Sequence, residues 1–199
     1  CFGYIAFARM VSGMGTTIFA AHSIAITAEQ IVYIPGYGLR VATSTLVGNA
    51  LGEKDIRKLK ATERVSILIT LLIMVVNGIG LYLFAYPFMR LFTNSVNAAR
   101  IGSEMLRLVS FSEPFFGLMI VLEGISYGMG RTKHVFACEA VSMWGIRIFG
   151  TFLCVNVFEL GLKAVWLCMI ADNICKAILL YIFRPKHVEE NADDRGELR

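Results

Sequence analysis

The segment Val65–Met89 most constrains the fold, because its 25 residues include no Asp, Glu, Lys or Arg. About 20 apolar residues are enough for an α-helix to cross the hydrocarbon core of a bilayer. The whole chain of 199 residues is similarly apolar, with 56% hydrophobic and 17% charged residues, whereas soluble domains carry about 25% charged residues. These features predict a membrane protein and exclude an ordinary soluble domain.

The other apolar runs predict an all-α fold, a polytopic membrane helix bundle. Two glycines around Met14 indicate a turn, and Pro35 with its neighbouring glycines predicts a bent helix. We expect about five and a half transmembrane helices, at residues 1–12, 16–51, 65–89, 100–129, 133–158 and 163–183. The first helix is expected to be truncated, and the chain is expected to be a fragment of a longer protein.

Lysine and arginine are unevenly divided between the alternating loops. The segments 53–64, 130–134 and 184–186 hold nine, while the loops between them hold three. The positive-inside rule therefore predicts a multi-pass protein of the cell (plasma) membrane with a cytoplasmic carboxyl terminus. Residues 1–184 are expected to form the transmembrane part and residues 185–199, with a net charge of −2, a charged cytoplasmic tail. The bases lie mainly at the ends of apolar runs, which argues against a nucleic-acid partner.

The sequence gives no catalytic or metal-binding pattern that fits its context. The five cysteines are an odd number without a C-x-x-C pair, so we interpret them as small packing residues. Gly124–Gly128 matches G-x-S-x-G, but that motif needs a strand before it, and Ser126 lies in an apolar helix. The glycines fit close helix packing better. We expect neither an enzyme nor a bound metal or cofactor.

Acids at membrane depth are the candidates for function, since each costs about 2.5–3.5 kcal/mol on insertion scales. Tyrosines follow two of them at helical spacing, and a carboxylate beside aromatic faces suits an organic cation. The candidate residues for binding substrate or coupling cation are Glu29, Glu113, Glu123, Tyr33, Tyr37 and Tyr127.

Other charges are expected to pair for structural reasons. Asp172 and Lys176 are one helical turn apart, and Arg147 is expected to neutralise an acid on a neighbouring helix. Glu29 and Arg40 are eleven residues apart and should share one helix face. They are too distant for a direct bridge, so each needs another partner or water.

Several short motifs, taken in order, resemble the multidrug and toxic compound extrusion family. The resemblance to its eighth helix rests on AAHSIA at 20–25, YIPGYG at 33–38, STLVGN at 44–49 and LG at 51–52. Residues 124–132 resemble the exit of its tenth helix, Trp144 with Arg147 its eleventh, and Trp166 with Asp172 its twelfth.

The resemblance implies a twelve-helix transporter built from two six-helix lobes, in which this chain is the carboxyl-terminal lobe. It implies an antiporter that exports small organic cations by alternating access, with H+ or Na+ as the coupling ion. The implied partners are the lipid bilayer and the amino-terminal lobe of the same polypeptide.

Two positions depart from the family pattern. Residues 130–132 read Gly-Arg-Thr where the family has Gly-Asp-Thr, and Phe116 stands where some branches place an acid. A flippase for lipid-linked sugars is the alternative, although only Arg40, Arg147 and Lys176 are available for a diphosphate. A third interpretation is a non-transporting membrane packing subunit, whose acids would all be paired.

Overall fold

The computed structural model describes residues 2–158 and 160–183 of the chain. Among these residues there are helices and no strands. The predicted tail at 185–199 lies outside the described residues. The helices are α1 (Phe2–Ser12), α2 (Thr16–Gly52), α3 (Ile56–Phe92), α4 (Val96–Ser110), α5 (Glu113–Gly128), α6 (Thr132–Ser142), α7 (Phe149–Phe152) and α8 (Leu162–Ile182), with π-helical turns η1 (Met143–Ile148) and η2 (Leu153–Val157) around α7.

The described helices have the lengths and compositions that a bilayer requires. Four continuous helical segments are long and apolar enough to cross a membrane, and α4 with α5 makes a fifth if that bent pair is one span. The predicted all-α membrane bundle is therefore confirmed. Helix α3 extends on both sides of its uncharged centre, and Asp55 caps it by accepting a hydrogen bond of 2.9 Å from the Lys58 amide.

The helix predicted at residues 100–129 is wrong as a single element, because the chain bends by 61° between α4 and α5. The Ser112 amide donates to the Val109 carbonyl, and the Ser112 hydroxyl donates to that carbonyl as well. Pro114 lies in the first turn of α5, where its missing amide hydrogen leaves no helical bond unmade. The polar groups of Ser112 thus have hydrogen-bond partners although the helix is interrupted there.

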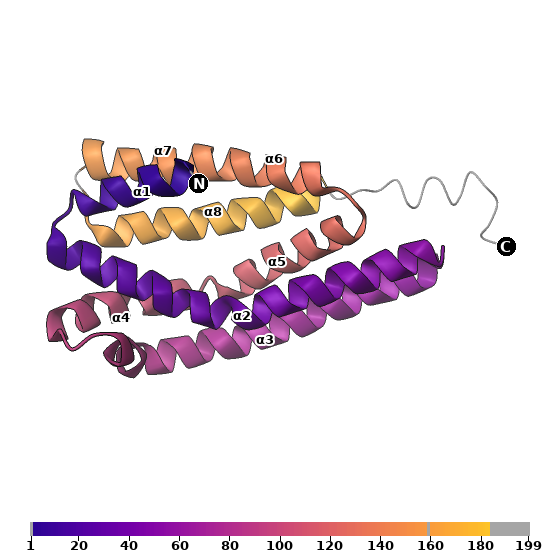
Figure 1. Cartoon of the computed structure of the whole chain (residues 1–199), viewed down its shortest axis with the longest axis horizontal. Helices are drawn as coiled ribbons and strands as arrows, with labels where there is room; N and C mark the ends of the chain where they lie inside the picture. Colours follow the sequence, from indigo (N-terminus) through magenta and orange to yellow (C-terminus); the bar gives the residue numbers. More distant parts are fainter. Residues whose placement is uncertain (1, 159, 184–199) are drawn as a thin grey trace.

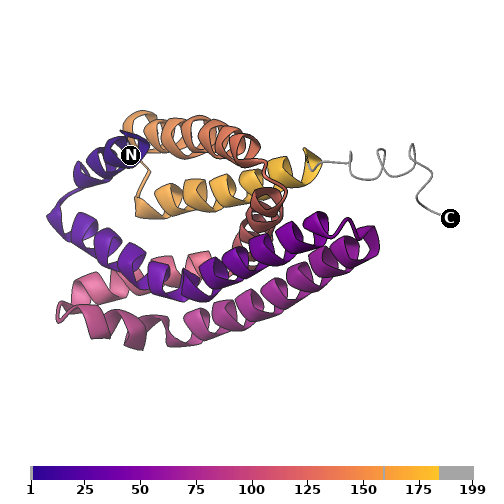
Figure 2. The same ribbon diagram turned by 45° about the vertical axis from the view of Figure 1, so that its right-hand side comes forward.

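Helix α5 lies at the centre of the bundle. It contacts α2 and α3 on one side and α8 on the other, and Figures 1 and 2 show it between the α2–α3 pair and the layer formed by α6, α7 and α8. Helix α2 continues through Pro35, and its axis changes direction near the middle of its length (Figure 1). The predicted bend is therefore present without a break in the helix.

Two glycines let α5 approach α2 closely. A Cβ atom on Gly124 would lie 2.7 Å from the Arg40 carbonyl oxygen, and one on Gly128 would lie 2.6 Å from that of Ser44. Both pairs are four residues apart along their helices, so the two backbones touch on successive turns. At the end of α5, Gly130 adopts a positive φ of 73°, which the turn into α6 requires.

Candidate functional site

A cavity of about 240 Å³ lies inside the bundle. Its walls come from α1, α2, α5, α6, η1 and α8, so it is enclosed by elements that are far apart in the sequence. Acids, bases and aromatic rings line it together: Glu29, Glu123 and Glu139; Arg40, Arg147 and Lys176; Tyr33, Tyr37 and Phe116. A mixed lining of this kind is typical of a site for a small polar or charged ligand.

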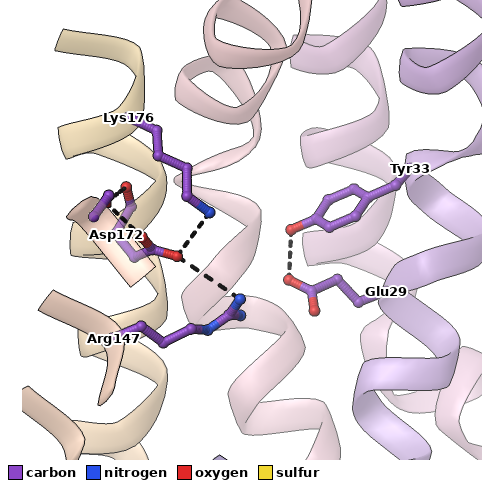
Figure 3. Close-up of polar contacts among 6 residues, drawn as sticks. Glu29, Tyr33, Arg147, Asp172 and Lys176 are labelled. Atoms are coloured by element: carbon purple, nitrogen blue, oxygen red, sulfur yellow. Dashed lines mark hydrogen bonds and ion pairs between the residues drawn. The ribbon is translucent and has the colours of Figure 1, made fainter. Parts of the chain in front are cut away.

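Glu29 lies on the α2 wall of the cavity and is 4% exposed. The Tyr33 hydroxyl, one turn further along the same helix, donates a hydrogen bond of 2.5 Å to Glu29 Oε1 (Figure 3). Within the described residues, no cationic side chain forms an ion pair with Glu29. Its carboxylate is therefore hydrogen-bonded by a neutral donor, while Arg147 acts on its charge without forming an ion pair with it.

Aromatic rings form the neighbouring part of the wall. Tyr33 stacks on Phe116 of α5 with ring centroids 3.7 Å apart and an angle of 14° between planes. Tyr37 meets both rings edge-on, at centroid distances of 6.5 and 6.2 Å. Phe116 thus places a π face beside the Glu29–Tyr33 pair.

The opposite wall carries a group of paired charges, which we call the Asp172 cluster: Asp172, Lys176, Arg147 and Ser142. Asp172 is fully buried, and its Oδ2 lies 3.0 Å from Lys176 Nζ and 3.7 Å from Arg147 Nη1. The Ser142 hydroxyl donates to Oδ1 at 2.5 Å. Figure 3 shows the Lys176 and Arg147 side chains pointing toward the side of the cavity that carries Glu29.

Glu123 pairs with Arg40, the residue that sequence spacing had placed on the Glu29 face of α2. Arg40 Nη1 lies 3.0 Å from Glu123 Oε2, although the two residues are 83 positions apart. The Arg40 guanidinium also lies over the rings of Tyr37 and Tyr127, at 5.2 and 5.9 Å. Tyr127 is therefore a contact of Arg40 and is not among the residues that line the cavity.

Glu113 occupies a different place from the other acids. It is fully buried in the first turn of α5, beside the break from α4, and it does not line the cavity. Neither of its carboxylate oxygens has a hydrogen-bond partner among the described residues. It packs against Gly78 of α3, where a Cβ atom would lie 3.1 Å from that of Glu113. Glu29 and Glu113 interact electrostatically, so a charge on one opposes a charge on the other.

Two polar contacts of the interior were not predicted from the sequence. The Trp166 indole donates 3.2 Å to His22 Nδ1, which joins α8 to α2, and Ser142 joins α6 to Asp172. Their only sequence signal is a polar residue within an apolar run. The Ser126 hydroxyl donates to the Leu122 carbonyl of its own helix at 2.8 Å, as a packing residue does.

The family is decided by a match to the MatE family model over residues 1–153, about three quarters of the chain. The chain belongs to the MatE family. A probable multidrug resistance protein NorM from Thermotoga maritima is 30% identical over 183 residues, covering 91% of this chain and 39% of that protein. A multidrug resistance protein NorM from Aliivibrio fischeri is 25% identical over 181 residues, covering 89% of this chain and 39% of that protein.

Solved structures have the same fold. The chain superimposes on the eukaryotic MATE transporter AtDTX14 with a TM-score of 0.84 at 21% identity, covering 98% of this chain and 46% of that one. It superimposes on an outward-facing multidrug resistance MATE transporter with a TM-score of 0.85 at 19% identity, covering 95% and 43%. The chain therefore spans less than half the length of these MatE relatives, which are multi-pass membrane transporters and not enzymes.

Proposed function

We propose that the chain is the carboxyl-terminal lobe of a secondary transporter that exports small organic cations in exchange for H+ or Na+. Membership of the MatE family and relatives that are named multidrug resistance proteins support this function. The amino-terminal lobe of the same polypeptide would complete the transporter. The two lobes would rock about a central pathway and expose it to each side of the membrane in turn, as repeat-built transporters do.

The Glu29–Tyr33–Phe116 wall of the cavity is the observation that carries the proposal. A buried carboxylate that forms no ion pair among the described residues is placed beside two stacked rings. Carboxylate charge and π faces both attract a desolvated cation. An organic cation, a sodium ion or a proton would each satisfy Glu29, and since they compete for one charge, binding of one favours release of another.

The buried acids differ in whether they form an ion pair, and this difference indicates which of them could bind the coupling ion. Arg40 already neutralises Glu123, and Lys176 with Arg147 neutralises Asp172. Glu29 and Glu113 have no such ion pair among the described residues. We assign the coupling ion to Glu29, which lines the cavity, and a secondary role to Glu113, whose charge opposes that of Glu29.

The charges of the loops support one orientation of the chain in the membrane. Nine Lys and Arg residues in segments 53–64, 130–134 and 184–186 favour the cytoplasm for those loops and for the carboxyl terminus. The transporter would then lie in the cell membrane with the loop between η2 and α8 on the outer side. Export of a cation in exchange for an inward-moving H+ or Na+ uses the gradients that such a membrane carries.

A flippase for lipid-linked sugars is supported less well by this lining. A diphosphate needs several available bases, whereas Arg40, Arg147 and Lys176 each lie in ion pairs with buried acids. A packing subunit without transport activity is also disfavoured, because such a protein would pair its acids, and Glu29 and Glu113 form no ion pair among the described residues.

The test compares carboxylate neutralisation at matched sites in the whole transporter, reconstituted in vesicles. Glu29→Gln should abolish efflux of a fluorescent organic cation driven by a pH or Na+ gradient, with folded protein retained. Glu113→Gln should reduce it, and Glu123→Gln should act mainly through the freed Arg40. Glu104→Gln, on the exposed side of α4, is the control and should transport normally. Normal coupled efflux by all three variants would overturn the proposal.

A further inference from the structure

Two cysteines on neighbouring helices lie in contact at one end of the bundle. Cys154 belongs to η2 and Cys168 to α8, and their sulfurs are 3.7 Å apart. Both side chains are half-buried. At a rise of about 1.5 Å per residue, Cys154 lies roughly 6 Å from Phe158, where its helical segment ends, and Cys168 roughly 9 Å from Leu162, where α8 begins. The pair is therefore near one end of the bundle, and neither cysteine is among the residues that line the central cavity.

Local backbone geometry keeps these thiols together. Residues Leu153–Val157 form a π-helical turn, in which the Phe158 amide donates to the Leu153 carbonyl five residues back. The wider turn changes the direction of the side chains that it carries. On the other side of Cys168, a Cβ atom on Gly150 would lie 3.3 Å from the Cys168 sulfur, so the thiol rests against bare backbone. The contact is thus built by two features of the helix that precedes α8.

We propose that Cys154 and Cys168 form a reversible dithiol–disulfide pair that clamps η2 to α8. The sulfurs would have to approach from 3.7 Å to a bond length of about 2.05 Å, a shift within reach of rotation about the two Cα–Cβ bonds. The other described cysteines, Cys138 and Cys175, lie toward the opposite end of the same two helical segments and serve as internal comparisons.

The reaction is thiol–disulfide exchange with an external disulfide. The thiolate of one cysteine attacks a sulfur of the oxidant, a mixed disulfide forms, and the first thiolate of the oxidant leaves. The second cysteine loses its proton and attacks the mixed disulfide at the protein sulfur, which releases the second thiolate. The protein loses two electrons and two protons, and the external disulfide is reduced to two thiols.

The position of the pair favours this chemistry. In the proposed orientation the end of η2 and the start of α8 face the outside of the cell, where disulfides persist more readily than in the cytoplasm. The cross-link would close a short loop between the two helices and so restrict separation of their ends in the unfolded chain. It is independent of Glu29, and therefore does not require the transport proposal to hold.

The experiment treats the whole protein, in membranes and in detergent, with 2,2′-dithiodipyridine, a membrane-permeant aromatic disulfide. Free thiols are then blocked, and the peptides are identified by mass spectrometry. We expect a peptide pair linked through Cys154 and Cys168, and no link from either of them to Cys138 or Cys175. The midpoint of thermal unfolding should rise by several degrees and return to its original value after reduction.

Three variants separate the pair from other cysteine chemistry. Cys154→Ser should leave Cys168 with a stable pyridylthio group and abolish the thermal shift, and Cys168→Ser should do the same for Cys154. Cys175→Ser should still form the link and keep the shift. Stable separate adducts on both Cys154 and Cys168 in the unaltered protein, or a link with no thermal shift, would overturn the proposal.

Discussion

The two walls of the central cavity bury acids in opposite ways. On the α8 side, Asp172 is enclosed by Lys176, Arg147 and Ser142. On the α2 side, Glu29 receives a single hydroxyl donor from Tyr33 and has no ion pair among the described residues. Both acids are 4% exposed or less, so burial alone does not distinguish them. The comparison teaches that two acids buried to a similar depth can differ in their partners, and the roles proposed for Glu29 and Asp172 rest on that difference.

The largest effect should come from removing the acid of the Asp172 cluster. Asp172→Asn removes the carboxylate that pairs with the buried Lys176, which should lower the free energy of unfolding by about 3–5 kcal/mol. Glu29→Gln breaks no ion pair among the described residues and should change the free energy of unfolding by less than about 1 kcal/mol. Thermal unfolding of the detergent-purified variants measures both.

A double variant tests whether the loss of stability comes from the unpaired charge of Lys176. If Asp172→Asn fails through unbalanced charge, adding Lys176→Met should restore part of the lost stability. Equal thermal midpoints for Asp172→Asn and Glu29→Gln would contradict the expectation that the two acids contribute differently to stability.

An intermediate effect is expected where α5 touches α2, because this contact aligns the Arg40–Glu123 pair between the two walls. A methyl group on Gly124 would meet the Arg40 carbonyl oxygen at 2.7 Å, so Gly124→Ala must push the helices apart. We expect a loss of about 1–3 kcal/mol in the free energy of unfolding. Gly80→Ala in α3 is the control, since nothing lies within 4 Å of the added atom. A loss at position 80 as large as at position 124 would contradict the steric explanation.

The smallest effect is expected for an ion pair on the surface of the bundle. Lys163 Nζ lies 3.1 Å from Glu104 Oε2, with side chains 71% and 43% exposed. Glu104→Gln should change the free energy of unfolding by no more than about 0.5 kcal/mol, because water screens exposed charges. If Glu104→Gln lowered the free energy of unfolding as much as Asp172→Asn, the contribution of an ion pair would not depend on its burial.

Local sequence rules predicted those parts of the molecule that depend on neighbours in the chain. The uncharged run at 65–89 predicted α3, and the four-residue spacing of Asp172 and Lys176 placed both on one face of α8. The bend at Pro35 followed from its missing amide hydrogen. Each of these features is decided by residues of a single helix.

The features that were not predicted depend on the packing of distant segments. The partner of Arg40 is 83 residues away, so helical spacing could not select Glu123. The break before Glu113 and the π-helical turns at 143–148 and 153–157 have no hydropathy signal, because broken and continuous helices have the same apolar composition. Glu29, Glu113 and Glu123 therefore looked alike in the sequence, and only the fold gave them three different environments.

The contact of α2 with α5 on successive turns has a consequence for measuring motion in this lobe. The backbones of α2 and α5 touch at Gly124 and Gly128, so we expect the two helices to move together. Spectroscopic labels on exposed positions of α2 and α5 should then keep a constant distance in the proposed transport cycle. Labels on α4 and α5 span the 61° bend instead. The α2–α5 distance would serve as a constant reference, and the α4–α5 distance would report a change in the bend angle.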